Sequence, residues 1–219
     1  MVKKIFTLII IVFACNPLFA QQPKKIQRPK LVVGIVVDQM RWDYLYRYHD
    51  RYGERGFKRL LNEGFSCENT FINYLPSYTA VGHTVVYSGS IPAIDGIVGN
   101  DWVDQITGRK WYCTEDTIAQ TVGATGKVGQ MSPNNLLVST ITDELRLATN
   151  FQSKVVGVSL KDRAAILPAG HTANAAFWFD DNSGRFVTST YYMQDLPEWV
   201  KKFNANDEPR KLVANGWNT

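Results

Sequence analysis

Three groups of residues in this 219-residue sequence combine types and positions that could support chemistry. Asp38 directly follows an apolar run over 31–37. Lys161 and Arg163 follow a second apolar run, over 154–160. In open α/β sheets, ligands gather beyond the carboxyl ends of the strands. If the two runs are neighbouring strands, a carboxylate and two cations therefore meet at one edge of a sheet. Taken singly, the aspartate could equally cap a helix, and the basic pair could belong to a solvated turn.

The third group is centred on Thr79, at the predicted start of a short helix. A hydroxyl at that place normally caps the helix. The same place also suits a nucleophile, because free backbone N–H groups and the positive end of the helix dipole can hold an anion such as phosphate. A threonine hydroxyl is a poor nucleophile until its proton is removed or a metal ion binds its oxygen. Asp38 could supply one ligand to such a metal.

Two further candidate residues follow this threonine in the sequence. His83 stands one helical turn after Thr79, but a histidine on a helix face is more often packed and hydrogen-bonded, so the predicted metal ligands do not include it. Asn100 follows Gly99 and could be a turn residue. It could equally donate its amide N–H to a phosphoryl oxygen.

The pattern of apolar residues predicts the elements that position these groups. The runs 31–37 and 154–160 are typical of strands buried on both faces of a sheet. The other predicted elements, in order, are a helical stretch over 42–61 that breaks near Gly53 and Gly56 and closes at Gly64, an extended segment over 65–74, a helix over 79–87, a hairpin over 102–112, a helix from Ser132-Pro133 to Asn150 and a hairpin over 177–192. This order predicts an α/β layered fold with a central, mostly parallel sheet.

The first thirty residues predict export. Residues 1–20 have the pattern of a signal peptide, with lysines near the start, an apolar run over 5–14 and a small residue before position 21. The apolar run is too short for a stable membrane span. An alternative makes Cys15 the lipid-carrying first residue of a lipoprotein. Residues 21–30 carry two prolines and four positive charges and predict a linker, which leaves 31–219 as the folded domain. The predicted location is the periplasm or the cell exterior.

Charge and cysteine content narrow the function classes. Six of the 24 Lys and Arg residues precede residue 31, so the predicted domain carries 18 basic against 20 acidic residues. This balance disfavours a protein that binds nucleic acid through phosphate neutralisation. Past the signal peptide two cysteines remain, Cys67 and Cys113. In an exported protein such a pair predicts one disulfide, although two buried free thiols fit the same spacing.

Four stretches around these residues resemble the alkaline phosphatase superfamily. Within it, they are most similar to the branch related to type I phosphodiesterases and nucleotide pyrophosphatases, and closest to periplasmic phosphate-irrepressible alkaline phosphatases that use threonine. The stretches are LVVGIVVDQMR at 31–41, NYLPSYTAVGHTVVYSGS at 73–90, GIVGNDW at 96–102 and SLKDRA at 159–164. They span nearly the whole chain after the linker, in the family's order.

The resemblance implies a role for each residue. Asp38 would ligate one zinc ion of a two-zinc site. Thr79 would bind the same zinc and become transiently phosphorylated, and Asn100 would hydrogen-bond a phosphoryl oxygen. Lys161 and Arg163 match the basic pair of the monoesterases, because an ammonium and a guanidinium can hold the extra charged oxygen of a monoester dianion.

The implied activity is zinc-dependent hydrolysis of small phosphomonoesters through a phosphothreonine. A phosphodiesterase or nucleotide pyrophosphatase with the same nucleophile is one alternative, and a non-catalytic exported α/β domain is another. The family completes its zinc sites with aspartates and histidines from a second half of the chain, and nothing in this sequence resembles them. We therefore expect the amino-terminal part of a larger enzyme, inactive by itself, and the oligomeric state stays open. Asp95 stands where relatives usually carry histidine.

Overall fold

The computed structural model describes residues 28–214 and 216. The predicted signal peptide and the first part of the predicted linker, 21–27, lie outside the described residues. The chain divides into two units, Met1–Val37 and Asp38–Thr219. The helices and strands described below belong to the second unit.

The apolar run 31–37 does not form a strand, which contradicts the prediction. No strand pairs with it in the described part of the chain, and its residues are exposed, with Leu31 at 78% and Ile35 at 77%. A buried strand needs neighbours for its backbone groups and cover for both faces. The predicted extended segment 65–74 likewise forms no strand and carries exposed phenylalanines at 65 and 71.

The helical stretch after Asp38 breaks where two glycines predict a break. It consists of α2 (Tyr44–Arg47), a 3₁₀ turn (His49–Arg51) and α3 (Phe57–Glu63). Gly56 precedes α3 with φ of 70°, a conformation that favours glycine. Gly64 ends the helix as predicted, and its N–H donates to the carbonyl of Leu60 at 2.9 Å.

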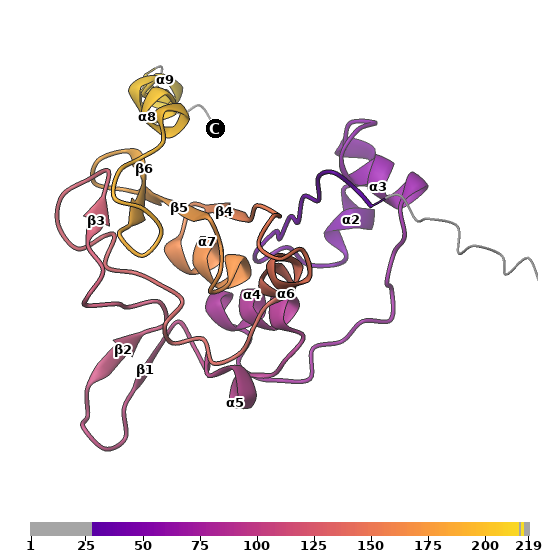
Figure 1. Ribbon diagram of the computed structural model, residues 1–219. Coiled ribbons are helices and arrows are strands. Elements are labelled where there is room, and N and C mark those ends of the chain that lie inside the picture. Colours follow the sequence, from indigo (N-terminus) through magenta and orange to yellow (C-terminus); the bar gives the residue numbers. More distant parts are fainter. Residues whose placement is uncertain (1–27, 215, 217–219) are drawn as a thin grey trace, which may run out of the picture. The chain divides into compact units, whose positions relative to one another are not determined.

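The central stretch of the chain largely follows the prediction (Figure 1). Helix α4 spans Thr79–Ser88 and ends at Gly89, which has a φ of 66°. The short helix α5 (Pro92–Asp95) leads to an antiparallel hairpin of β1 (Asp101–Val103) and β2 (Lys110–Tyr112), in which Trp102 lies opposite Trp111.

The next helix begins eight residues later than predicted. Helix α6 spans Ile141–Ala148, and Ser132-Pro133 leads only into a turn. Thr140 is the N-cap in a capping box, with its hydroxyl accepting from the N–H of Asp143 and its own N–H donating to the Asp143 carboxylate. Two orphan N–H groups are satisfied in this way, which fixes the helix start at Thr140.

Asp143 also ties α6 to the segment that follows α7, because its second carboxylate oxygen accepts from the N–H and the hydroxyl of Thr172 at 2.7 and 2.8 Å. Burial acts to raise the pKa of this carboxyl, but the hydrogen bonds from Thr140 and Thr172 outweigh it and hold the pKa below its ordinary value.

Asp143→Asn is expected to lower the free energy of unfolding by about 2 kcal/mol at pH 7. Because the folded-state pKa is depressed, this stabilisation is present above the unfolded pKa of about 3.9 and is lost as the pH falls through the folded-state value. Urea unfolding of the whole protein at pH 7, 5 and 3 measures it. The difference in free energy of unfolding between wild type and Asp143→Asn should shrink at pH 3, whereas the exposed control Asp50→Asn should unfold like wild type at every pH. A difference that does not change with pH would contradict the depressed pKa of Asp143.

The larger sheet has the strand order β3-β6-β5-β4. Its strands are β3 (Thr121–Val122), β4 (Val156–Ser159), β5 (Ala175–Asp180) and β6 (Arg185–Ser189). β4 and β5 pair in parallel, while β5–β6 and β3–β6 are antiparallel. The α/β class and the second hairpin are confirmed. The expected mostly parallel sheet is not found among the described strands, because a hairpin rather than a crossover supplies β6.

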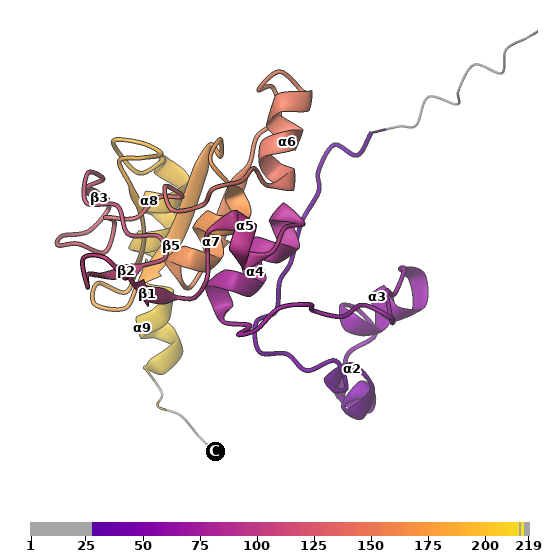
Figure 2. The same cartoon turned by 90° about the horizontal axis from the view of Figure 1, so that it is seen from below.

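Helices cover both faces of this sheet (Figure 2). Successive residues of a strand face opposite sides. On one side Trp178 packs with Ala165 and Ile166 of α7 (Asp162–Ala169), and on the other side Phe177 packs with Val200 of α8 (Glu198–Ala205). The last helix is α9 (Glu208–Val213). β4 carries Gly157 where α7 crosses it, and any side chain there would collide with the carbonyl of Ala165. The missing side chain sets how closely α7 approaches the sheet.

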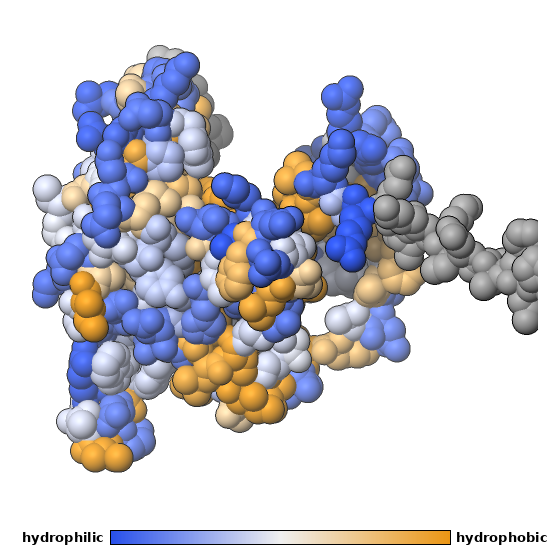
Figure 3. Space-filling view, viewed as in Figure 1, coloured by the Kyte–Doolittle hydropathy of each residue, from blue (hydrophilic) through white to orange (hydrophobic). Residues whose placement is uncertain are grey.

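The surface of this unit mixes polar and apolar side chains. An apolar patch covers the region of α5 (Figure 3), where Ile94, Val98 and Leu137 are exposed. Among the described residues, no helix has both the length and the apolar character that crossing a bilayer requires.

Candidate active site

Thr79 and Asp38 are in direct contact. The Thr79 hydroxyl donates to Asp38 Oδ2 at 2.9 Å, and Asp38 lies in a turn rather than at the end of a strand. Tyr78 is the N-cap of α4, and Thr79 is the first helical residue. The hydroxyl of Thr79 therefore does not cap the helix, and it is oriented by a carboxylate 41 residues earlier in the chain.

Asn100 is attached to the first turn of the same helix. Its amide oxygen accepts from the N–H of Ala80 at 2.9 Å, and its backbone carbonyl accepts from the N–H of Cys113 at 3.0 Å. With the oxygen turned to α4, the NH₂ group is the end of this amide that is left to donate. No described residue accepts a hydrogen bond from it, so it is available to a bound anion.

His83 is packed and hydrogen-bonded, as the sequence predicts. Its side chain is buried, and its Nδ1 lies 2.8 Å from the carbonyl oxygen of Thr79. A carbonyl only accepts, so Nδ1 carries the proton. His83 thereby fixes the first turn of α4 from within, through the carbonyl of Thr79.

The basic pair is bound to other partners. Lys161 Nζ lies 3.0 Å from Asp181 Oδ2, and both side chains are exposed. Exposed pairs of this kind stabilise a protein by about 1 kcal/mol or less, so this contact does not hold the lysine firmly. Next to it lies an open pocket of about 360 Å³, lined in part by Lys161, Asp181 and Trp178. In the described part of the chain, neither Lys161 nor Arg163 contacts Thr79 or Asn100 by a hydrogen bond.

Arg163 enters a network that sequence reasoning missed. Its Nη1 donates to the hydroxyl of Tyr112 at 2.8 Å, and that hydroxyl donates to Asp162 Oδ1 at 2.9 Å. The hydroxyl of Thr114 donates to the other oxygen of Asp162. Burial, and then the negative charge of Asp162, raises the pKa of the Tyr112 phenol well above its ordinary value, so the phenol stays protonated. The members of this network come from two stretches that are 50 or 51 residues apart in the chain, and no local sequence pattern indicates that they pair.

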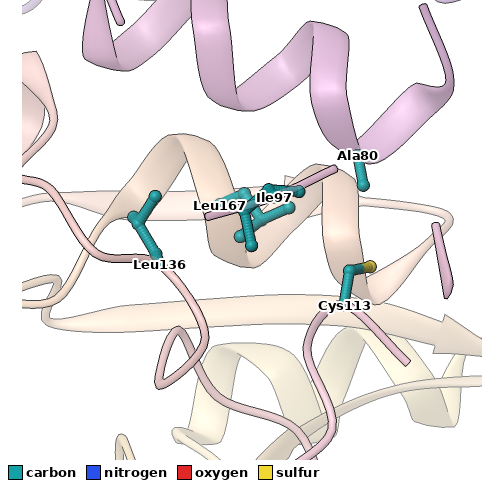
Figure 4. Close-up of a cluster of buried hydrophobic side chains, with 5 residues drawn as sticks. All are labelled: Ala80, Ile97, Cys113, Leu136 and Leu167. Atoms are coloured by element: carbon teal, nitrogen blue, oxygen red, sulfur yellow. The ribbon is translucent and has the colours of Figure 1, made fainter. Parts of the chain in front are cut away.

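A single apolar cluster joins the elements that carry these residues. Its buried members are Ala80, Ile97, Cys113, Leu136 and Leu167 (Figure 4). Ala80 follows Thr79, Cys113 follows Tyr112, and Leu167 lies one helical turn after Arg163 on α7. The start of α4, the end of the hairpin and α7 therefore share one core.

The predicted disulfide is absent. Cys67 and Cys113 are free cysteines, the first exposed and the second buried. Cys113 fills a place in the apolar cluster, and burial together with the charge of Asp162 raises the pKa of its thiol to about 12. Packing rather than covalent pairing accounts for Cys113.

The residues present fit part of a zinc site. Asp38 and Thr79 bring two oxygen donors within 2.9 Å of each other. Zinc in proteins usually takes four ligands. The described residues contain no group of three or more His, Cys, Asp or Glu side chains that could hold a metal. Asp38 and Thr79 could thus supply two ligands of such a site, and its other ligands must come from outside the described residues.

The sequence of this chain is similar to those of known proteins. The family described as type I phosphodiesterase / nucleotide pyrophosphatase matches residues 32–217. A protein of Myroides odoratus named calcium-transporting ATPase is 65% identical over 196 residues, which are 90% of this chain and 36% of that protein. Alkaline phosphatase PafA of Elizabethkingia meningoseptica is 62% identical over 201 residues, which are 91% of this chain and 37% of that protein.

Two crystal structures of alkaline phosphatase PafA share the fold, and both cover 89% of this chain and 38% of theirs. The wild-type structure gives a TM-score of 0.86 at 62% identity. A variant with four substitutions, at a threonine, an asparagine, a lysine and an arginine, gives 0.86 at 60% identity. The chain thus spans somewhat more than a third of the length of these relatives.

Proposed function

Because the chain belongs to the type I phosphodiesterase / nucleotide pyrophosphatase family, we propose that it carries the nucleophile and phosphate-binding part of an alkaline phosphatase. One observation carries this proposal: Thr79 is the first residue of α4, and its hydroxyl donates to Asp38 Oδ2 at 2.9 Å. The proposed activity is that of the whole protein containing the chain, since the matched relatives are longer.

In the proposed reaction the oxygen of Thr79 attacks phosphorus in line. The bond from phosphorus to the alcohol oxygen breaks, the alcohol takes up the proton that the Thr79 hydroxyl loses, and a phosphothreonine forms. Water later hydrolyses this ester to phosphate and returns the Thr79 hydroxyl. Asp38 holds the hydroxyl in the orientation for attack. Zinc, held by Asp38 and Thr79 with ligands from elsewhere in the protein, would lower the pKa of the threonine hydroxyl so that it reacts at neutral pH.

The start of α4 and Asn100 would stabilise the phosphoryl oxygens. A helix N-terminus favours an anion through its dipole and its free N–H groups. The amide NH₂ of Asn100, whose oxygen is already bonded to Ala80, can add a hydrogen bond that strengthens as charge redistributes. The PafA variant has substitutions at a threonine, an asparagine, a lysine and an arginine, and the lysine and the arginine are two positions apart. Thr79, Asn100, Lys161 and Arg163 show the same types, order and final spacing.

Lys161 and Arg163 separate this proposal from its nearest rival. A phosphomonoester dianion presents one more charged oxygen than a diester, and a lysine and an arginine can bind it. The family description includes phosphodiesterases and nucleotide pyrophosphatases, and one relative is named an ATPase. A monoester, a diester and ATP are therefore the substrates to compare.

Lys161→Ala combined with Arg163→Ala is expected to lower kcat/KM for p-nitrophenyl phosphate by about 100-fold, because hydrogen bonds to charged groups contribute about 1.5–3 kcal/mol each. The value for a bis(p-nitrophenyl) diester should change by less than about threefold on the same grounds, since its third oxygen carries no charge. The control is Arg210→Ala with Lys211→Ala, an exposed pair on α9. A retained monoester preference would show that the basic pair does not select the substrate.

We also propose that the protein acts on small phosphate esters in the periplasm or outside the cell. The pattern of a signal peptide over 1–20 supports export, and the charge balance of 31–219 does not favour nucleic acid as a substrate. Zinc as the metal follows from the proposed family chemistry and the oxygen donors of Asp38 and Thr79.

A further inference from the structure

The side chain of Arg163 is held at one point. In the described part of the chain, its Nη1 donates to the Tyr112 hydroxyl at 2.8 Å, and its Nε is buried without a hydrogen-bond partner. Leaving a buried charged donor unpaired costs free energy, and native structures rarely do so without a functional reason. The guanidinium therefore has a donor that no described residue binds.

Tyr112 is fixed in turn by Asp162. The phenol donates its only proton to Asp162 Oδ1 at 2.9 Å, so only an oxygen lone pair can face Arg163. Thr114 holds the other oxygen of the same carboxylate. The direction of each hydrogen bond is thus set, from Thr114 and Tyr112 to Asp162 and from Arg163 to Tyr112.

This network is joined to the start of α4. Cys113 follows Tyr112 in the chain and packs in one cluster with Ala80, which follows Thr79. Arg163 donates to the hydroxyl of Tyr112, the residue directly before Cys113, so it is bonded to the residue next to this cluster. The arginine is therefore attached to the same piece of core as the nucleophile.

We propose that Tyr112, anchored by Asp162, is a positioning residue that orients the Arg163 guanidinium toward the phosphoryl group of a monoester. The inference rests on the proposed function and deepens it, because it assigns part of the choice between monoester and diester to a tyrosine outside the basic pair. The guanidinium donors other than the one bonded to Tyr112 would then bind charged phosphoryl oxygens, and guanidinium groups bind phosphate strongly when two such donors act together.

A double-mutant cycle in the whole, zinc-loaded protein tests this. Tyr112→Phe removes only the hydroxyl, and it should lower kcat/KM for p-nitrophenyl phosphate about tenfold and weaken inhibition by inorganic phosphate by a similar factor, the value of one hydrogen bond to a charged group. Diester hydrolysis should stay within twofold on the same reasoning. In the Arg163→Ala background the same substitution should change nothing beyond about twofold, because coupled residues are not additive. An equal loss in both backgrounds, or none in either, overturns the proposal.

Two further variants keep the outcome decisive. Tyr191→Phe is the matched control, since it removes one tyrosine hydroxyl that donates to the backbone carbonyl of His171, and it should leave all constants unchanged. If Tyr112→Phe does not fold, Thr114→Val replaces it in the cycle with the same expected selectivity, and absence of a monoester loss overturns the proposal. Thr79→Ala is assayed in parallel. If it remains active, the proposed function fails and the inference with it; if it is inactive while Tyr112→Phe matches wild type, the inference alone fails.

Discussion

Replacing Thr79 with alanine is expected to lower kcat for phosphomonoester hydrolysis by at least about 10⁴-fold in the whole protein. The hydroxyl is the only group of this side chain that can form a bond to phosphorus, and Asp38 orients it at 2.9 Å. Thr79→Ser keeps the oxygen and should retain activity within about tenfold of wild type, because only the rotamer restriction of the β-branched side chain is lost. Steady-state assays with p-nitrophenyl phosphate measure both.

Trapping the intermediate makes this result specific. Acid quenching of wild type during turnover should give a phosphorylated peptide containing Thr79, detected by mass spectrometry, and Thr79→Ala should give none. Stability serves as the control, because Tyr78 rather than Thr79 is the N-cap of α4. The alanine variant should therefore unfold within about 1 kcal/mol of wild type. Activity of the alanine variant within tenfold of wild type would show that another group is the nucleophile.

Asp38→Asn is expected to weaken zinc binding by more than about 100-fold and to lower kcat/KM by about 1,000-fold. Loss of a residue that merely supports a ligand costs about 10–100-fold in metal affinity, so loss of a charged ligand should cost more. The amide of asparagine can still accept the hydrogen bond from Thr79, so the orientation of the hydroxyl is kept while the charge is removed. The substitution thus separates metal binding from hydroxyl orientation.

Equilibrium dialysis against zinc gives a readout that does not depend on turnover. Asp50→Asn, in an exposed aspartate of the 3₁₀ turn, is the matched control and should bind zinc as wild type does. Chelation of wild type should abolish activity, and added zinc should restore it in the control but not in Asp38→Asn at the same concentration. Unchanged zinc affinity in Asp38→Asn would show that this carboxylate is not a ligand.

Local signals predicted the elements whose ends are set by neighbouring residues. Gly89 ends α4 because it adopts the positive φ of 66° that glycine tolerates. Gly64 ends α3, and its N–H donates to the carbonyl of Leu60. The start of α6 was predicted wrongly, because Ser132-Pro133 has the composition of a helix start while Thr140 and Asp143 make the reciprocal bonds of a capping box. The serine–proline pair instead begins a turn, closed by the N–H of Leu136 on the carbonyl of residue 133.

Features that depend on distant partners were not predictable in the same way. The run 31–37 has the composition of a buried strand, but composition does not reveal whether a neighbouring strand is present. The chemistry of the two residues, and then the resemblance of the surrounding stretches, suggested that Asp38 and Thr79 share a metal, but no spacing rule predicts their direct contact. The Tyr112 network had no sequence signal. Asp162 and Arg163 lie 50 and 51 residues after Tyr112, and only the packing of α7 brings them to the hairpin.

Cys67 and Cys113 differ in exposure and together allow local opening of the protein to be measured. The thiolate attacks thiol reagents, so an exposed cysteine such as Cys67 should be labelled at once. Cys113 is fully buried and its thiol has a pKa of about 12, so it can react only when the cluster beneath the start of α4 opens. The labelling rate of Cys113 in Cys67→Ser therefore reports how often that cluster opens, without an engineered cysteine. Substitutions such as Leu167→Ala can then be ranked by how far they loosen the support of Thr79 and Arg163 before the whole chain unfolds.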